Sequence, residues 1–108
     1  MKELAFSGRA LDDLRAFPPL IRRVCGYQLD KVQQGREPDD WKPMPSVGNG
    51  VREIRVRGDD GAFRVVYIAT LKDAVYVLHC FVKKSDKTPK SDIDLAKDRY
   101  RELMRRMQ

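Results

Sequence analysis

Basic side chains recur at alternating positions in the second half of this sequence, among residues typical of β-strands. Arg55 and Arg57 alternate in "VREIRVRG", Arg64 follows in "AFRVVYIAT", and His79, the one histidine, precedes Lys83 in "VYVLHCFVKK". An arginine guanidinium can hold a phosphate through two parallel N–H donors, a lysine adds a point charge, and an imidazole exchanges protons near neutral pH. If the strands gather these residues on one surface, that surface suits acid–base chemistry on a phosphodiester.

Three predicted strands must position these side chains. Residues 51–58 and 62–70 flank the turn "DDG", and residues 75–82 follow "LKDA". Alternating apolar and polar residues bounded by such turns predict an antiparallel meander.

If both hairpins have two-residue turns, the positions of the turns decide which side chains share a face. The predicted turns are Asp59-Asp60 or Asp60-Gly61 in the first hairpin and Lys72-Asp73 in the second. Arg64 then lies opposite Phe81. The residues predicted for this cationic face are Arg55, Arg57, Arg64, His79, Phe81 and Lys83, with Val66, Ile68, Val75 and Val77 at its other end. The residues predicted for the opposite, core face are Ile54, Val56, Phe63, Val65, Tyr67, Tyr76, Leu78, Cys80 and Val82. We expect a helix to cover the apolar half of the cationic face, which leaves a basic cleft where Phe81 can stack on a base.

The first half of the chain is predicted to be largely helical. Residues 2–6 alternate weakly and indicate a short first strand. An apolar stripe over residues 10–17, with Ser7 as its N-cap, predicts a helix that ends at Pro18-Pro19. A second stripe over residues 20–32 predicts another helix, so the two are expected to form a helical hairpin.

A long connection and a last helix complete the predicted order. Gly35 follows the second helix as a stop, and residues 36–50 form a connection rich in proline and glycine. We expect Trp41, Met44 and Val47 to anchor this connection, because so long a loop needs contacts with the body. Residues 91–107 predict a helix with a capping box formed by Ser91 and Asp94. The order β-α-α-β-β-β-α is typical of an α+β fold with helices packed on an antiparallel sheet.

Composition limits the classes of protein to consider. With 108 residues, 42% of them hydrophobic, we expect a single domain over residues 1–108. The formal charge of +6 suits an anionic partner. The N-terminal segment does not resemble a signal peptide and no apolar run is long enough to span a membrane, so we expect a cytoplasmic protein. Cys25 and Cys80 are far apart in sequence, and with a single histidine they predict buried thiols, no metal site and no cofactor.

Lysines continue the basic character beyond the last strand. Lys84 and Lys87 follow Lys83 closely, and we expect them to bind phosphate at the rim of the cleft. Lys90 precedes the last helix and is expected to be merely solvated.

The order and spacing of these motifs resemble a known family. The most specific segments are "REIR", "FRVVY" and "LHCFVKK…KTP", and "EPDDWKPMP" and the helical pair before it also match. Together they resemble the phage-derived branch of the RelE/HigB-type toxins of bacterial type II toxin–antitoxin systems. The resemblance covers essentially the whole chain. It implies a compact RelE-like fold, with a small antiparallel sheet, a helical hairpin at one side and a C-terminal helix.

The resemblance also implies an activity and partners. Members are mostly messenger-RNA endoribonucleases that act on the ribosome and stop translation. A cognate antitoxin, typically a helix-turn-helix protein of the HigA-like kind, neutralises them. The implied reaction needs no metal: the 2′-OH attacks the adjacent phosphate and leaves a 2′,3′-cyclic phosphate and a 5′-OH.

Site residues can be carried over at matching positions. The family arginine of the middle strand of the meander matches Arg64, the basic position after the last strand matches Lys83 or Lys84, and Arg55 and Arg57 match more loosely. The family's C-terminal aromatic or histidine is missing from "MRRMQ". The general acid and base therefore stay open between Lys83 and His79. Two alternatives also stay open, a ParE-like toxin that acts on DNA gyrase and a non-catalytic nucleic-acid-binding member of the fold.

Overall fold

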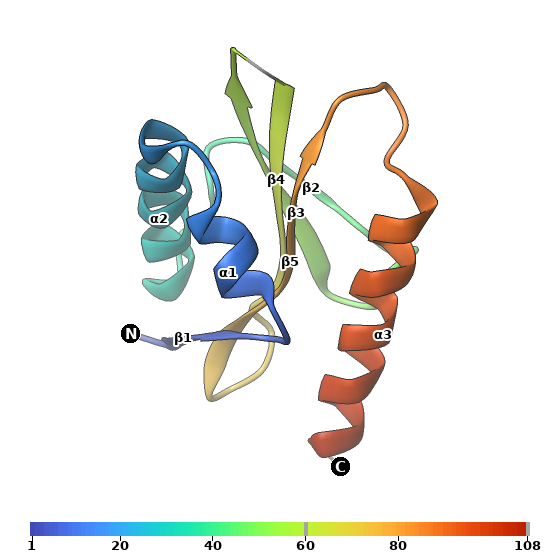
Figure 1. Ribbon diagram of the computed structural model, residues 1–108. Coiled ribbons are helices and arrows are strands. Elements are labelled where there is room, and N and C mark those ends of the chain that lie inside the picture. Colours follow the sequence, from blue (N-terminus) through green and yellow to red (C-terminus); the bar gives the residue numbers. More distant parts are fainter. Residues whose placement is uncertain (60, 108) are drawn as a thin grey trace.

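In the computed structural model, which describes residues 1–59 and 61–107, a five-stranded sheet lies at the centre and helices cover both of its faces (Figure 1). The strands are β1 (Glu3–Phe6), β2 (Trp41–Pro43), β3 (Val51–Gly58), β4 (Gly61–Ile68) and β5 (Ala74–Lys83). Their order across the sheet is β1-β5-β4-β3-β2. The α+β class is therefore confirmed.

The helices lie where the apolar stripes predict them. On one face of the sheet, α1 (Ala10–Arg15) packs against β5 and α2 (Pro19–Gln33) packs against β3, while α3 (Lys90–Arg106) covers the other face (Figure 1). Gly35 ends α2 as expected, with φ of +80°, a conformation that glycine adopts without steric cost.

Both predicted serine caps are wrong. The residue before α1 is Arg9, and Ser7 contributes only its backbone carbonyl, which accepts from the amide of Ala10. The residue before α3 is Pro89, and its carbonyl accepts from the amide of Asp92. Because α3 begins one residue before Ser91, that hydroxyl lies inside the first turn and cannot act as a cap.

The prediction of a purely antiparallel sheet is also wrong. β1 pairs with β5 in parallel, from Glu3 opposite Ala74 to Phe6 opposite Val77. β2, which the sequence did not reveal, pairs antiparallel with β3 at the far edge. A three-residue strand that contains Pro43 is compatible only with an edge, where a missing N–H costs little. The direction of β1 depends on the crossover through the helices, which alternation within residues 2–6 does not encode.

The β3–β4 hairpin has the predicted register along its whole length, whereas the β4–β5 hairpin has it at the basic end only. Gly58 pairs with Gly61, and the predicted turn between them includes Asp60, which lies outside the described residues. Arg64 lies opposite Phe81, as expected. Beyond Val66 the pairing shifts by one residue, and the second connection runs from residue 69 to residue 73 instead of being a two-residue turn at 72–73.

This β-bulge reverses the facing of four residues. Leu78 is the extra residue on β5, because Val66 pairs with His79 while its neighbour Tyr67 pairs with Val77. A shift of one residue moves every following side chain to the other face. Val75 and Val77 therefore pack with α1 and α2, and Tyr76 and Leu78 pack on the α3 side, the opposite of the predicted assignment.

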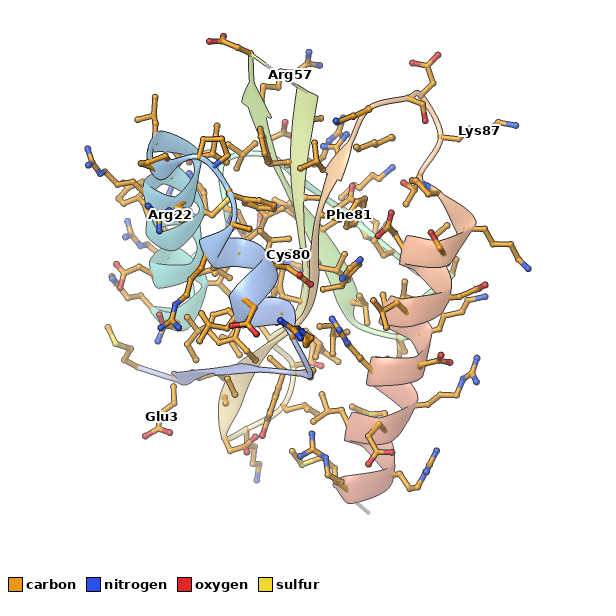
Figure 2. All side chains as sticks on the ribbon, viewed as in Figure 1. Glu3, Arg22, Arg57, Cys80, Phe81 and Lys87 are labelled. Carbon is orange, nitrogen blue, oxygen red and sulfur yellow. The ribbon has the colours of Figure 1, made fainter. Side chains whose placement is uncertain are left out.

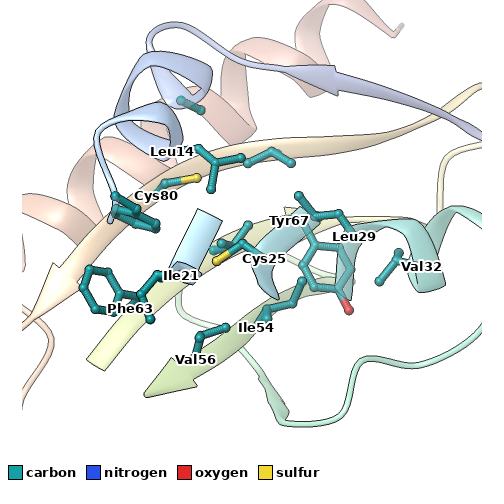
Figure 3. Packing of buried hydrophobic residues seen from close by; sticks show 14 of the residues in the cluster. Leu14, Ile21, Cys25, Leu29, Val32, Ile54, Val56, Phe63, Tyr67 and Cys80 are labelled. Carbon is teal, nitrogen blue, oxygen red and sulfur yellow. The ribbon is translucent and has the colours of Figure 1, made fainter. Parts of the chain in front are cut away.

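Two cores result, one on each face of the sheet. The core between the sheet and α1 and α2 contains both cysteines (Figure 3). It also contains the edge-to-face pair of Phe17 and Phe63. The core under α3 contains Met44 and Val47, which anchor the long connection as predicted. Trp41 is half-buried instead, and its ring lies 3.9 Å from the guanidinium carbon of Arg52.

The two thiols provide a test of the first core. Cys25 and Cys80 are free and buried. Burial raises the pKa of the Cys25 thiol from 9.0 to about 11 and raises that of Cys80 further. At about pH 8 we expect neither thiol to react with iodoacetamide in the native protein and both to react in guanidinium. Equal reaction rates in the native and denatured protein would contradict this packing.

The same shifts predict a loss of stability in alkali. The unfolded chain releases the Cys25 proton near pH 9.0, whereas the folded chain holds it up to about pH 11. Stability from this thiol is therefore present below pH 9 and falls as the pH rises between these two values. Melting temperatures of the wild type and Cys25→Ala, compared across that range, measure the effect.

Candidate functional site

A pocket of about 210 Å³ opens at the basic end of the sheet, between the β3–β4 hairpin and the loop that leads from β5 to α3. The residues that line it are Asp40, Arg55, Arg57, Ala62, Arg64, Lys83, Ser85 and Asp86. The structure thus brings together four of the side chains that the sequence predicts for one site. The register explains this grouping, since Arg55 lies directly opposite Arg64, and Ala62 pairs with both Arg57 and Lys83.

Arg64 is the most deeply placed of these cations. It is 6% exposed, and its Nε is buried without a hydrogen-bond partner among the described residues. Burial lowers the pKa of Arg64, and repulsion by Arg55 and Arg57 adds to that effect, while attraction by Glu53 and Asp40 opposes it. A guanidinium stays charged even so, because its ordinary pKa is far above neutral. Arg64 is therefore a fixed, poorly solvated positive charge at the pocket wall.

Glu53 is a buried acidic residue next to Arg64 that was not among the predicted site residues. It is 0% exposed, its Oε1 lies 3.6 Å from Nε of Arg64, and neither carboxylate oxygen has a hydrogen-bond partner among the described residues. Alternation along "VREIRVRG" would have found it, because Glu53 lies two residues before Arg55 and so shares the cationic face. The basic, aromatic and aliphatic residues predicted for that face did not include this carboxylate.

Two further carboxylates lie at the pocket itself. Asp40 Oδ1 is 3.9 Å from Nε of Arg55, and the backbone carbonyl of Asp40 accepts from the amide of Arg55. Asp86 lines the wall contributed by the loop after β5. The lining therefore holds four cations and two anions, and it is positive overall.

His79 and Phe81 lie apart from the pocket, under α3. The two rings stack with centroids 5.1 Å apart, and both residues are buried (Figure 2 labels Phe81). Nε2 of His79 is 2.7 Å from Oδ1 of Asp92, and its Nδ1 is 3.4 Å from Nη1 of Arg99. Both ring nitrogens thus have partners on α3. The arrangement ties that helix to β5 and leaves Phe81 covered.

Lys84 and Lys87 are exposed on the loop after β5 and do not line the pocket (Figure 2 labels Lys87). The loop contributes Ser85 and Asp86 instead. The two lysines can still attract a long anion electrostatically, because they extend the positive charge beyond the pocket.

A larger hollow, about 340 Å³, lies at the C-terminal end of α2, but two of the three cations that line it, Lys2 and Arg52, are already engaged. Lys2 donates to the backbone carbonyls of Ala69 and Leu71. Arg52 pairs with Glu37 at 3.7 Å and also stacks on Trp41. The smaller basic pocket is therefore the better candidate for an anionic ligand.

Fold and site together define a small α+β protein that presents a cluster of arginine and lysine side chains at one end of its sheet. The chain belongs to the phage-derived Gp49-like protein family (DUF891), whose match covers residues 12–101 of the 108. This family is associated with toxin–antitoxin systems. No curated protein matches the chain. No helix among the described residues has the length and apolar character needed to cross a membrane.

Proposed function

We propose that this protein is a RelE/HigB-type toxin of a type II toxin–antitoxin system and that it cleaves messenger RNA on the ribosome, in the cytoplasm. The observation that carries the proposal is the pocket where Arg55, Arg57, Arg64 and Lys83 converge from three strands. Like charges held together repel one another, and an anion such as a phosphodiester relieves that repulsion. Membership of a toxin–antitoxin-associated family supports the same function.

The proposed reaction is a transesterification within the RNA. The 2′-oxygen forms a bond to the adjacent phosphorus, and the bond from phosphorus to the 5′-oxygen breaks. The 2′-OH loses its proton to a base, and the departing 5′-oxygen gains one. Arg64 stabilises the negative charge that develops on the phosphoryl oxygens, and this electrostatic term is usually the largest in such catalysis.

Lys83 is the better candidate for proton transfer, because it lines the pocket whereas His79 does not. Arg55 and Arg57 would hold the flanking phosphate, and Lys84 and Lys87 would attract the RNA strand. The ribosome would supply most of the substrate positioning, so activity on free RNA should be weak. A helix-turn-helix, HigA-like antitoxin would neutralise the toxin by covering the basic pocket.

Induction of the gene without an antitoxin, followed by mapping of mRNA 5′ ends, tests the function. We expect translation arrest with cuts at defined codon positions for the wild type, no cuts for Arg64→Ala, and wild-type behaviour for Arg22→Ala, an exposed arginine on α2. DNA damage with intact mRNA would support the ParE-like alternative. The absence of any growth defect would support a non-catalytic nucleic-acid-binding role. Full toxicity of Arg64→Ala would contradict the proposed site.

His79 has a separate expected result. Replacing it with alanine leaves Asp92 without its partner and removes the ring that stacks on Phe81. We expect His79→Ala to lower the free energy of unfolding by about 1–3 kcal/mol, with little change in cleavage per folded molecule. Denaturant unfolding and ribosome-dependent cleavage, measured on the same samples, separate the two effects. A stable variant without cleavage would instead assign proton transfer to His79.

A further inference from the structure

A buried carboxylate among cations calls for a physical explanation. Glu53 is completely buried, and it lies on the same face of β3 as Arg55 and Arg57. An ion pair in the interior is often no more stabilising than apolar side chains of similar size, since both charges lose their hydration. The acidic partners of the other arginines lie at the surface, so Glu53 differs from them. Fold stability alone does not explain why this carboxylate is buried.

The contact between Glu53 and Arg64 involves one edge of the guanidinium. Oε1 lies 3.6 Å from Nε, and this Nε is buried. Arg64 nevertheless lines the pocket. The edge formed by the two terminal nitrogens is therefore the part of Arg64 that is left for a ligand, and a guanidinium can bind a phosphate through that pair of nitrogens.

We propose that Glu53 is a positioning residue for Arg64. It attracts the guanidinium at its Nε edge through the buried ion pair and so presents the two terminal nitrogens to the phosphodiester. Its negative charge also offsets the repulsion that Arg55 and Arg57 exert on Arg64. This inference rests on the proposed function for the identity of the ligand, but the orientation of Arg64 can be tested without it.

The charge of Glu53 and its positioning of Arg64 affect different measurements, so the two roles can be separated. Removal of a negative charge beside a basic pocket strengthens the binding of an anion, whatever its other consequences. If the guanidinium of Arg64 is present but no longer held in place, only those contacts weaken that the transition state needs in a defined geometry. A positioning residue is therefore recognised when its removal lowers the cleavage rate without weakening the binding of a small anion.

Glu53→Gln keeps the shape of the side chain and removes its charge. We expect the rate of mRNA cleavage at saturating ribosome concentration to fall by about 10–100-fold. The affinity of the free protein for inorganic phosphate is expected to stay the same or rise. The matched control is Glu102→Gln, because Glu102 is an exposed partner of Arg105 on α3, at 3.3 Å. An unchanged cleavage rate in a folded Glu53→Gln protein would overturn the proposal.

The wild-type protein offers a second test that does not depend on a variant. In nitrogen-15 NMR spectra, we expect a slowly exchanging Nε–H signal for Arg64 and separate signals for its two terminal amino groups, as restricted rotation produces. Terminal groups that average as freely as those of exposed Arg22 would overturn the positioning role. If the wild type does not cleave mRNA but Arg64 is held in this way, the proposed function fails and the positioning of Arg64 stands.

Discussion

Arg64→Lys is expected to reduce ribosome-dependent mRNA cleavage by about 10²–10³-fold, although it preserves the positive charge. A lysine offers a point charge in place of two parallel N–H donors, so it cannot reproduce bidentate contact with the phosphoryl oxygens. It still places a positive charge beside the carboxylate of Glu53, which without it would be buried with no counter-charge. We therefore expect the variant to remain folded.

Single-turnover cleavage by purified protein on programmed ribosomes measures this effect. The matched control is Arg22→Lys on α2, where the side chain is exposed and outside the pocket. Near wild-type cleavage by Arg64→Lys would show that charge alone suffices at this position. Loss of the native melting transition would instead assign Arg64 a structural role.

Leu103→Ala is expected to have the largest effect on stability. Leu103 is 0% exposed in the core between α3 and the sheet, which also contains Ala96. Truncation of such a side chain removes buried apolar contacts and leaves a cavity, which together lower the free energy of unfolding by about 2–5 kcal/mol. The total stability of a domain is small, so a loss of this size is a substantial share of it.

Leu95→Ala is the control, because it makes the same change on the same helix at a residue that is 37% exposed. We expect it to cost about 1 kcal/mol or less. Chemical denaturation of both variants, with the slope of the transition compared as well as its midpoint, checks the prediction. Equal losses at the two positions would show that helix propensity, and not packing under α3, dominates.

Local patterns in the sequence were enough to predict much of the fold. Period-two alternation identified β3, β4 and β5, and apolar stripes identified all three helices to within a few residues. Alternation also predicted that Arg55, Arg57, Arg64 and Lys83 come together, because their strands pair without irregularity at that end of the sheet. The functional roles of these residues, in contrast, remain predictions.

The mistakes in facing and in sheet topology share a cause, which is that they depend on contacts between distant segments. The bulge at Leu78 reversed the facing of Val75 and Val77, and nothing within β5 alone marks the extra residue. The parallel pairing of β1 and the existence of β2 likewise depend on where these segments meet the sheet.

The sequence by itself therefore determined most of the secondary structure and a basic surface suited to phosphate, because each follows from the spacing of neighbouring residues. Only the tertiary structure decided which charged groups are buried. It placed Glu53 against Arg64, and it placed His79 under α3 with partners for both ring nitrogens. The physical reason is that burial depends on what covers a face, and here that cover is a helix contributed by a different part of the chain.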